Sequence, residues 1–250
     1  MRKTPPATLN IIIVSLLVWL ASIVLPDKFG IDVVRYLGLH YWRSDAFNPL
    51  QLLTYIFMHD THSFGHIFCN MFGVWMFGRT VEELWGTKKF IFFYLFVGVG
   101  AGIIQELTWE IDLYGIVKDF DAAIAANSGE SLGEYQSLLI QGDITQGKAE
   151  DLIRLRGLLF SRLVTVGASG SLFGVLLAFG WLFPEARMML IFLPFIPIPS
   201  RVFVAVYAIF ELIFGLAGVA DGVAHFAHLG GLLFAAILLL IWKKKGKLYN

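Results

Sequence analysis

Long apolar runs without charged residues dominate the pattern of hydrophobic and polar positions along this chain. They cover residues 9–25, 90–104, 203–220 and 223–242, and Glu211 is the one charged residue within them. Runs of roughly 17–25 apolar residues match the ~30 Å hydrocarbon layer of a bilayer. The pattern therefore predicts a helical protein that crosses a membrane several times.

Six segments are apolar and long enough to be membrane spans. We expect them at about 9–25, 64–78, 89–105, 163–183, 202–220 and 222–242. The second carries His66 and Asn70, and the fourth is rich in Gly and Ser, so we expect the other helices to shield both from lipid. The prediction is an all-α polytopic membrane protein, folded as a single domain over residues 1–250.

The composition supports this interpretation. Hydrophobic residues make up 57% of the chain and charged residues 15%, with a mean hydropathy of +0.72, whereas soluble domains are usually about 25% charged. The net charge is zero and no basic stripe occurs, which excludes a nucleic-acid-binding protein. The single cysteine, Cys69, excludes an internal disulfide and a thiolate metal site. The expected surroundings are a lipid bilayer.

Charged residues outside the spans divide unequally between the two sides of the membrane. The side with the N-terminus, residues 79–89, residues 184–201 and the tail from 243 carries eleven Lys and Arg and three acids, and the other side carries eight and fifteen. Because Lys and Arg are retained in the cytoplasm, both termini are predicted to be cytoplasmic. Residues 26–63 and 106–162 would then face outward.

The segment at about 106–162, between the third and fourth spans, is long and carries ten acids against five bases. Leucines at 152, 155, 159 and 163 recur at helical spacing and predict a helix over 149–163. We expect two or three short helices outside the membrane, the last continuing into the fourth span, with turns at 127–129 and 141–143. The simplest interpretation is an inserted extracytoplasmic loop with a solvated face.

Four polar side chains are predicted to share one layer near the outer face. Ser169 lies about seven residues into the fourth span, which at 1.5 Å per residue is roughly 10 Å deep. His228 lies at a similar depth in the sixth span, and His66 and Asn70 fall in the first two turns of the second. A hydroxyl, imidazoles and an amide in one layer could supply the nucleophile, general base and oxyanion donors of acyl transfer.

Small residues surround this serine. Gly167 and Gly170 leave the backbone beside Ser169 bare, so a substrate carbonyl could approach closely. If a helix starts near Ser169, its backbone N–H would be a free donor for an oxyanion. Small residues four apart let two helices touch. Such pairs are Gly170 with Gly174 and Gly231 with Ala235.

These motifs resemble those of the rhomboid intramembrane serine proteases, along most of the chain. Gly167-Ala168-Ser169-Gly170 is similar to the serine motif of that family, and His66-Ile67-Phe68-Cys69-Asn70 to its His-x-x-x-Asn. His228-Leu229-Gly230-Gly231 is similar to the histidine motif, although Ala235 stands where glycine is usual. Trp42-Arg43 and residues 47–59 resemble the first outer loop. The spacing between His59 and His66 and the segment at 106–162 depart from the basic pattern.

The resemblance implies a bacterial-type core of six transmembrane helices and residue roles within it. Ser169 would be the nucleophile, His228 the general base, and His66 and Asn70 the oxyanion partners, with Gly167 beside them. Phe173 would lie under the histidine, and Gly231 would pack near the dyad. The resemblance implies no cofactor and no metal, transmembrane protein substrates, and a bacterial inner (plasma) membrane. The family uses a Ser–His dyad, and no acid in this sequence requires a triad.

Other interpretations of the same residues stay open. Ser169 could be a packing residue, and His225 could be the base instead of His228. His62 and His66 lie one helical turn apart and could bind zinc together with His59, although no acidic third ligand lies nearby on a helix and no His-Glu-x-x-His motif occurs. Glu211 could be a protonated carboxyl bonded to another helix, or it could hold cavity water.

Two other functions compete with an intramembrane serine endopeptidase that cuts near the outer face. A catalytically silent rhomboid-like protein that binds transmembrane clients predicts loss of Ser169 or His228, and both are present. A small transporter predicts inverted repeats or matched broken helices, and the sequence has neither.

Overall fold

The computed structural model describes residues 3–128, 148–190, 193–218 and 222–249, and these are mostly helical. The helical elements are α1 (Pro6–Phe29), α2 (Val33–Leu37), α3 (Gln51–Thr54), η1 (Tyr55–Phe57), α4 (Phe64–Gly73), η2 (Val74–Gly78), α5 (Arg79–Trp85), α6 (Thr87–Ala126), α8 (Ala149–Ser161), α9 (Ser169–Leu182), α10 (Ser200–Leu216) and α11 (His225–Lys244). Two antiparallel strand pairs accompany them: β1 (Leu39–His40) with β2 (Val164–Thr165), and β3 (Arg187–Leu190) with β4 (Leu193–Pro199).

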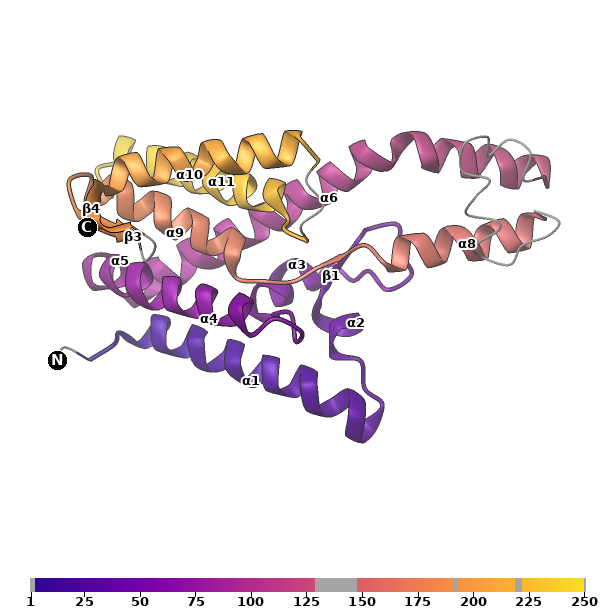
Figure 1. Cartoon of the computed structure of the whole chain (residues 1–250), viewed down its shortest axis with the longest axis horizontal. Helices are drawn as coiled ribbons and strands as arrows, with labels where there is room; N and C mark the ends of the chain where they lie inside the picture. Colours follow the sequence, from indigo (N-terminus) through magenta and orange to yellow (C-terminus); the bar gives the residue numbers. More distant parts are fainter. Residues whose placement is uncertain (1–2, 129–147, 191–192, 219–221, 250) are drawn as a thin grey trace.

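Six helical segments of the described chain lie side by side as a bundle, confirming the predicted helical polytopic membrane fold (Figure 1). Within the described residues α1, α6 and α11 are long and apolar enough to cross a membrane. The second segment runs without a break through α4, η2 and α5. The fourth and fifth, α9 and α10, have 14 and 17 residues.

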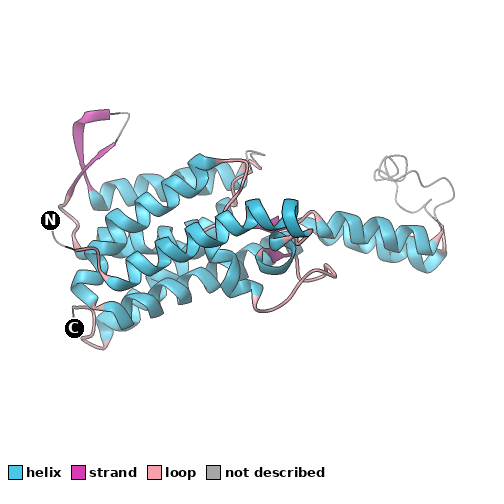
Figure 2. Ribbon diagram, turned by 90° about the horizontal axis from the view of Figure 1, so that it is seen from below, coloured by secondary structure: helices cyan, strands magenta, loops and turns pink. Residues whose placement is uncertain are grey.

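Both termini and the β3–β4 pair lie at one end of the bundle, and the outer half of α6 with α8 lies at the other (Figures 1 and 2). An even number of crossings produces such an arrangement. Which of the two ends faces the cytoplasm stays a prediction from the charge distribution.

The prediction for residues 106–162 was partly wrong. The third span continues unbroken as α6 to Ala126, where Asn127 adopts a left-handed conformation (φ 49°) and ends the helix. The expected helix at 149–163 is present as α8, but it does not continue into α9. The backbone between them is extended because β2 pairs with β1, with Leu39 opposite Thr165. The turn expected at 141–143 lies outside the described residues.

Helices α9 and α11 cross with their backbones in contact, as their small residues predict. A Cβ atom on Gly231 would lie 2.0 Å from the carbonyl oxygen of Gly170. One turn further along, a Cβ atom on Gly174 would lie 3.2 Å from Cβ of Ala235. No larger side chain fits at this crossing, so the glycines determine how closely the two helices approach.

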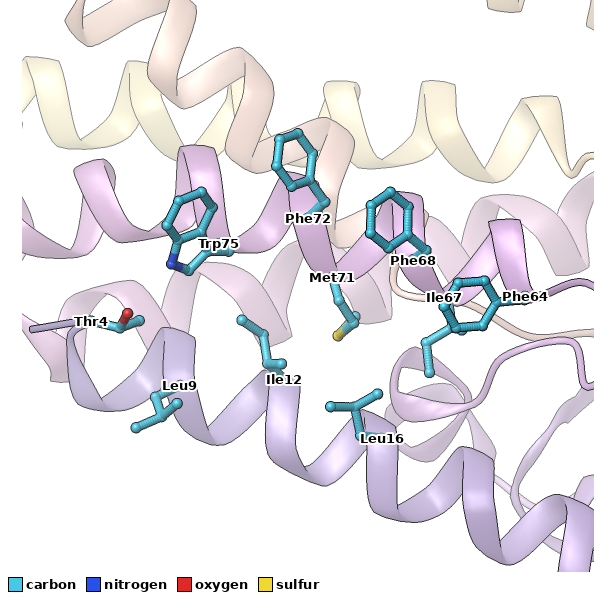
Figure 3. Close-up of a pocket in the computed structure, with 10 residues that line it drawn as sticks. All are labelled: Thr4, Leu9, Ile12, Leu16, Phe64, Ile67, Phe68, Met71, Phe72 and Trp75. Carbon is cyan, nitrogen blue, oxygen red and sulfur yellow. The ribbon is translucent and has the colours of Figure 1, made fainter.

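A shallow apolar groove of about 440 Å³ runs between α1 and α4 (Figure 3). The aromatic rings of Phe64, Phe68 and Phe72 form a ladder along one side, with neighbouring centroids 6.0 Å apart, and leucine and isoleucine side chains of α1 form the other. None of the described residues that line the groove is charged. This face of α4 is therefore suited to lipid, and Asn70 lies on the buried face of the same helix.

Candidate active site

The first turns of α9 and α11 bring Ser169 and His228 together. Nε2 of His228 lies 2.7 Å from Oγ of Ser169, across an interval of 59 residues in the sequence. Both helices begin at the end of the bundle that faces the α6–α8 extension (Figure 1). The predicted depth places Ser169 two turns inside a helix, whereas it is the first residue of α9. Its backbone N–H therefore belongs to the first turn, which has no intrahelical acceptors.

Two aromatic rings hold the imidazole of His228 in a fixed plane. Phe173, one turn after Ser169, stacks on that ring with a centroid distance of 4.3 Å and an interplanar angle of 12°. Tyr207 of α10 stacks on Phe173 at 5.0 Å. Three nearly parallel rings thus connect α11, α9 and α10, and they limit rotation of the histidine away from the serine.

His66 is oriented by its neighbouring loop. The backbone N–H of Asp60 donates to Nδ1 of His66 at 3.3 Å, so in the neutral ring Nε2 carries the proton. A Cβ atom on Gly167 would lie 3.1 Å from this Nε2 and 3.6 Å from Oγ of Ser169. The space between the two groups is open because Gly167, at φ 138°, has no side chain. A developing oxyanion in this space would meet the Nε2–H of His66.

Asn70 lies one turn after His66 on α4 and is buried. Its Nδ2 donates to the carbonyl oxygen of His66 at 2.9 Å, which uses one of its two amide hydrogens. The backbone N–H of Gly167 is also used, because it donates to the carbonyl oxygen of Tyr55 at 3.0 Å. Gly167 therefore contributes space to this site, and the backbone donor nearest the serine is that of Ser169 itself.

An acidic residue also reaches the histidine, which the sequence reasoning missed. Oε2 of Glu211 lies 3.0 Å from Nδ1 of His228 and 2.7 Å from Nδ1 of His225. The sequence reasoning found no acid that requires a triad, and it did not place Glu211 beside His228. The sequence signal that could have found Glu211 was its position as the single charged residue in the apolar run at 203–220. The sequence does not show toward which helix this side chain on α10 points. His225, which the sequence left as an alternative base, contacts Glu211 instead of Ser169.

The histidines considered for zinc do not gather as a metal site. In the part of the chain that the structure describes, the His, Cys, Asp and Glu residues close enough to share an ion are Glu211, His225 and His228, with ligand atoms within 4.8 Å of one another. The rings of His59 and His66 lie 5.3 Å apart, centroid to centroid. Burial lowers the pKa of His59 to about 4, so this loop histidine is neutral at pH 7.

The loop before α3 is bound to α6 by carboxylates. Glu110 accepts hydrogen bonds from the hydroxyl of Tyr41 at 2.6 Å, Nε1 of Trp42 at 2.7 Å and Nε of Arg43 at 3.0 Å. Glu106 accepts the backbone N–H of Trp42 at 2.9 Å. Burial, and then the bond to Glu110, raises the pKa of Tyr41 to about 12. The extended α6 thus anchors this loop directly after the end of β1.

Comparison with known proteins adds one match. A family model described as the Rhomboid domain matches residues 41–111 and 136–245, which include Ser169, His228, His66, Asn70 and Glu211. The unmatched interval, 112–135, falls in the outer part of α6 and the residues after it. Comparison with curated proteins gives no match.

Proposed function

The chain belongs to the rhomboid family, and from this premise we propose that it is an intramembrane serine endopeptidase that cleaves transmembrane proteins near the outer face of the membrane. The observation that carries the proposal is the 2.7 Å contact between Nε2 of His228 and Oγ of Ser169. This is the geometry of a nucleophile and its general base.

The proposed first half of the reaction is acylation. Oγ of Ser169 attacks the scissile carbonyl carbon while Nε2 of His228 takes the hydroxyl proton. The negative charge that develops on the carbonyl oxygen is stabilised by Nε2–H of His66, the free amide hydrogen of Asn70 and the backbone N–H of Ser169. His228 then gives its proton to the leaving amine as the peptide C–N bond breaks, which leaves an acyl-enzyme.

Hydrolysis of the acyl-enzyme follows the same path with water as the nucleophile. His228 takes a proton from water as the water oxygen attacks the ester carbon, and returns it to Oγ of Ser169 as the ester bond breaks. The new carboxyl terminus is released and the free serine is restored. These steps use groups of the chain and water.

The substrate class comes from the family resemblance and the location of the site. Family members act on transmembrane helices, and we propose substrates with a small residue at the cut and a helix that unwinds easily. The first turns of α9 and α11, which carry Ser169 and His228, lie at the end of the bundle opposite both termini. With cytoplasmic termini, as the charge distribution predicts, the cut would fall near the outer face.

A substitution of the serine tests the proposal directly. The purified protein in detergent should cleave a model transmembrane substrate and react with a fluorophosphonate serine probe. Ser169→Ala should abolish both activities. Ser171→Ala is the matched control, because Ser171 is two residues further along α9 and its hydroxyl donates to the carbonyl oxygen of Tyr94 instead of meeting a histidine.

Two outcomes would contradict the proposal. A folded Ser169→Ala protein that cleaves as well as the wild type would exclude this serine as the nucleophile. A folded wild-type protein that neither cleaves any of a panel of transmembrane substrates nor labels with the probe would favour the silent, client-binding alternative.

A further inference from the structure

Glu211 lies between two imidazoles inside the bundle. Its side chain is about 8% exposed, and its Oε2 is 2.7 Å from Nδ1 of His225 and 3.0 Å from Nδ1 of His228. The carboxyl group comes from α10, while both histidines come from the first turn of α11. A buried carboxylate is costly unless it is paired, and here the pairing involves the same imidazole that contacts Ser169.

The proposed reaction requires one tautomer of His228. Nε2 can accept the serine proton only if it is unprotonated, and the neutral ring then carries its proton on Nδ1. Oε2 of Glu211 is the acceptor that faces this nitrogen. In the resting structure the approach is close but not aligned as a hydrogen bond. Catalytic hydrogen bonds are often poorly aligned before substrate binds.

We propose that Glu211 is a positioning residue for the histidine, so that Ser169, His228 and Glu211 act in sequence. The carboxylate favours the Nδ1–H tautomer of His228 and stabilises the imidazolium that forms when the ring takes the serine proton. No proton passes to Glu211 in this scheme. The inference rests on the proposed function and adds a third residue to its dyad.

His225 supports this arrangement from the other side of the carboxyl group. Its Nδ1 contact with Oε2 of Glu211 restrains the glutamate, and its ring lies 5.7 Å from that of Phe214, centroid to centroid. A recess of about 170 Å³, lined in part by Gln105, Thr108 and His225, reaches the imidazole side of this pair at His225. We therefore assign His225 an indirect role, through Glu211.

Removing the charge while keeping the shape tests the proposal. Glu211→Gln should lower kcat by about 10²-fold with little change in KM, because His228 is still present but its imidazolium has lost the facing charge. A wholly structural glutamate would instead lower melting temperature and leave kcat of the folded fraction unchanged. Glu106→Gln is the matched control: Glu106 is also buried, but it binds the backbone of Trp42 and no histidine.

A second pair of variants applies if Glu211→Gln does not fold. Glu211→Asp and Glu211→Asn share one shape and differ in charge, so the aspartate variant should turn over faster than the asparagine variant. Equal kcat values for that pair, or a folded Glu211→Gln protein with wild-type kcat, would overturn the proposal. Either result leaves the proposed function standing as long as wild type cleaves and Ser169→Ala does not.

Discussion

Two helix pairs, one inside the bundle and one in the extension beyond it, are held together in different ways. Between α9 and α11 the backbones touch at Gly170 and Gly231, and no side chain separates them. Between the outer half of α6 and α8, side chains interlock instead, with Phe120, Leu152 and Leu155 buried in a small core. A salt bridge from Arg156 to Asp121 crosses the same pair at the surface.

The difference determines what each pair can tolerate. A backbone contact has no side chain that can move to absorb an added methyl group, so the distance between Ser169 and His228 depends directly on the glycines. A side-chain core of a few residues can repack or lose contacts without moving the rest of the bundle. We infer that the α9–α11 pair sets the catalytic geometry and that the α6–α8 pair is a separable support.

The largest expected effect comes from removing the imidazole while keeping the α9–α11 contact. His228→Ala should lower kcat by about 10²–10⁴-fold, because the serine would lose its proposed general base. His225→Ala should retain substantial activity, since His225 contacts Glu211 and not Ser169. Cleavage of a model transmembrane substrate by each purified variant, with folding checked by thermal melting, measures both. The reverse pattern would mean that the base is His225.

The next effect comes from adding one methyl group at the helix crossing. Gly231→Ala places a Cβ atom 2.0 Å from a backbone oxygen, so the helices must separate. Such overpacking costs about 1–3 kcal/mol of stability, and a displacement of about 1 Å at the dyad could cost 10²-fold in kcat. Substrate cleavage and melting temperature are the measurements.

The outer pair supplies the control for this substitution. Gly157 lies in α8, and a Cβ atom added there would have no neighbouring atom within 4 Å among the described residues. Gly157→Ala should therefore keep full activity and raise helix stability by about 0.5–1 kcal/mol. Loss of activity in both variants would contradict the distinction between the two helix pairs.

The same contrast explains what the sequence could predict. The partnership of α9 and α11 was predictable because glycines at fixed spacing and similar depths are local features of each span. The start of α9 at Ser169 was not, because it depends on the pairing of Val164 with His40, more than a hundred residues away. The direction of Glu211 depends on the rotation of α10 within the bundle, which no local pattern determines.

The length of α6 shows a different limit. The acidic residues from Glu106 onward predict that the third span ends there. The helix itself does not end there: α6 continues to Ala126, and the acidic residues mark only the change from an apolar to a polar sequence along it. Charge indicates where a span leaves the membrane, whereas a helix ends at its cap. Asn127 supplies that cap. It is the first residue of the turn that the sequence predicts at 127–129.

A smaller effect on activity is expected from weakening the outer core. Leu152→Ala removes a fully buried side chain and should cost about 2–5 kcal/mol within the α6–α8 pair. Limited proteolysis in detergent should cut α8 faster, while kcat stays near the wild-type value. Leu239→Ala is the matched substitution in α11, where the side chain is equally buried. It should lower the melting temperature of the whole protein. A loss of kcat in Leu152→Ala as large as that in Leu239→Ala would show that the α6–α8 pair is not separable.

The smallest effect is expected from deleting residues 127–142, most of which lie outside the described residues. Before deletion, Oδ1 of Asn127 accepts the backbone N–H of Ala149 at 2.8 Å, so the ends of α6 and α8 are close. The six residues that remain between Ala126 and Ala149 are long enough to join them. The deletion should therefore insert normally, label with the fluorophosphonate probe and cleave substrate within about twofold of the wild type, the range of a typical surface change. Ser169→Ala in the same deletion should remove the labelling. A folded deletion protein that no longer labels would mean that this outer segment helps to form the site, and the α6–α8 pair would then be part of the catalytic structure instead of a support for it.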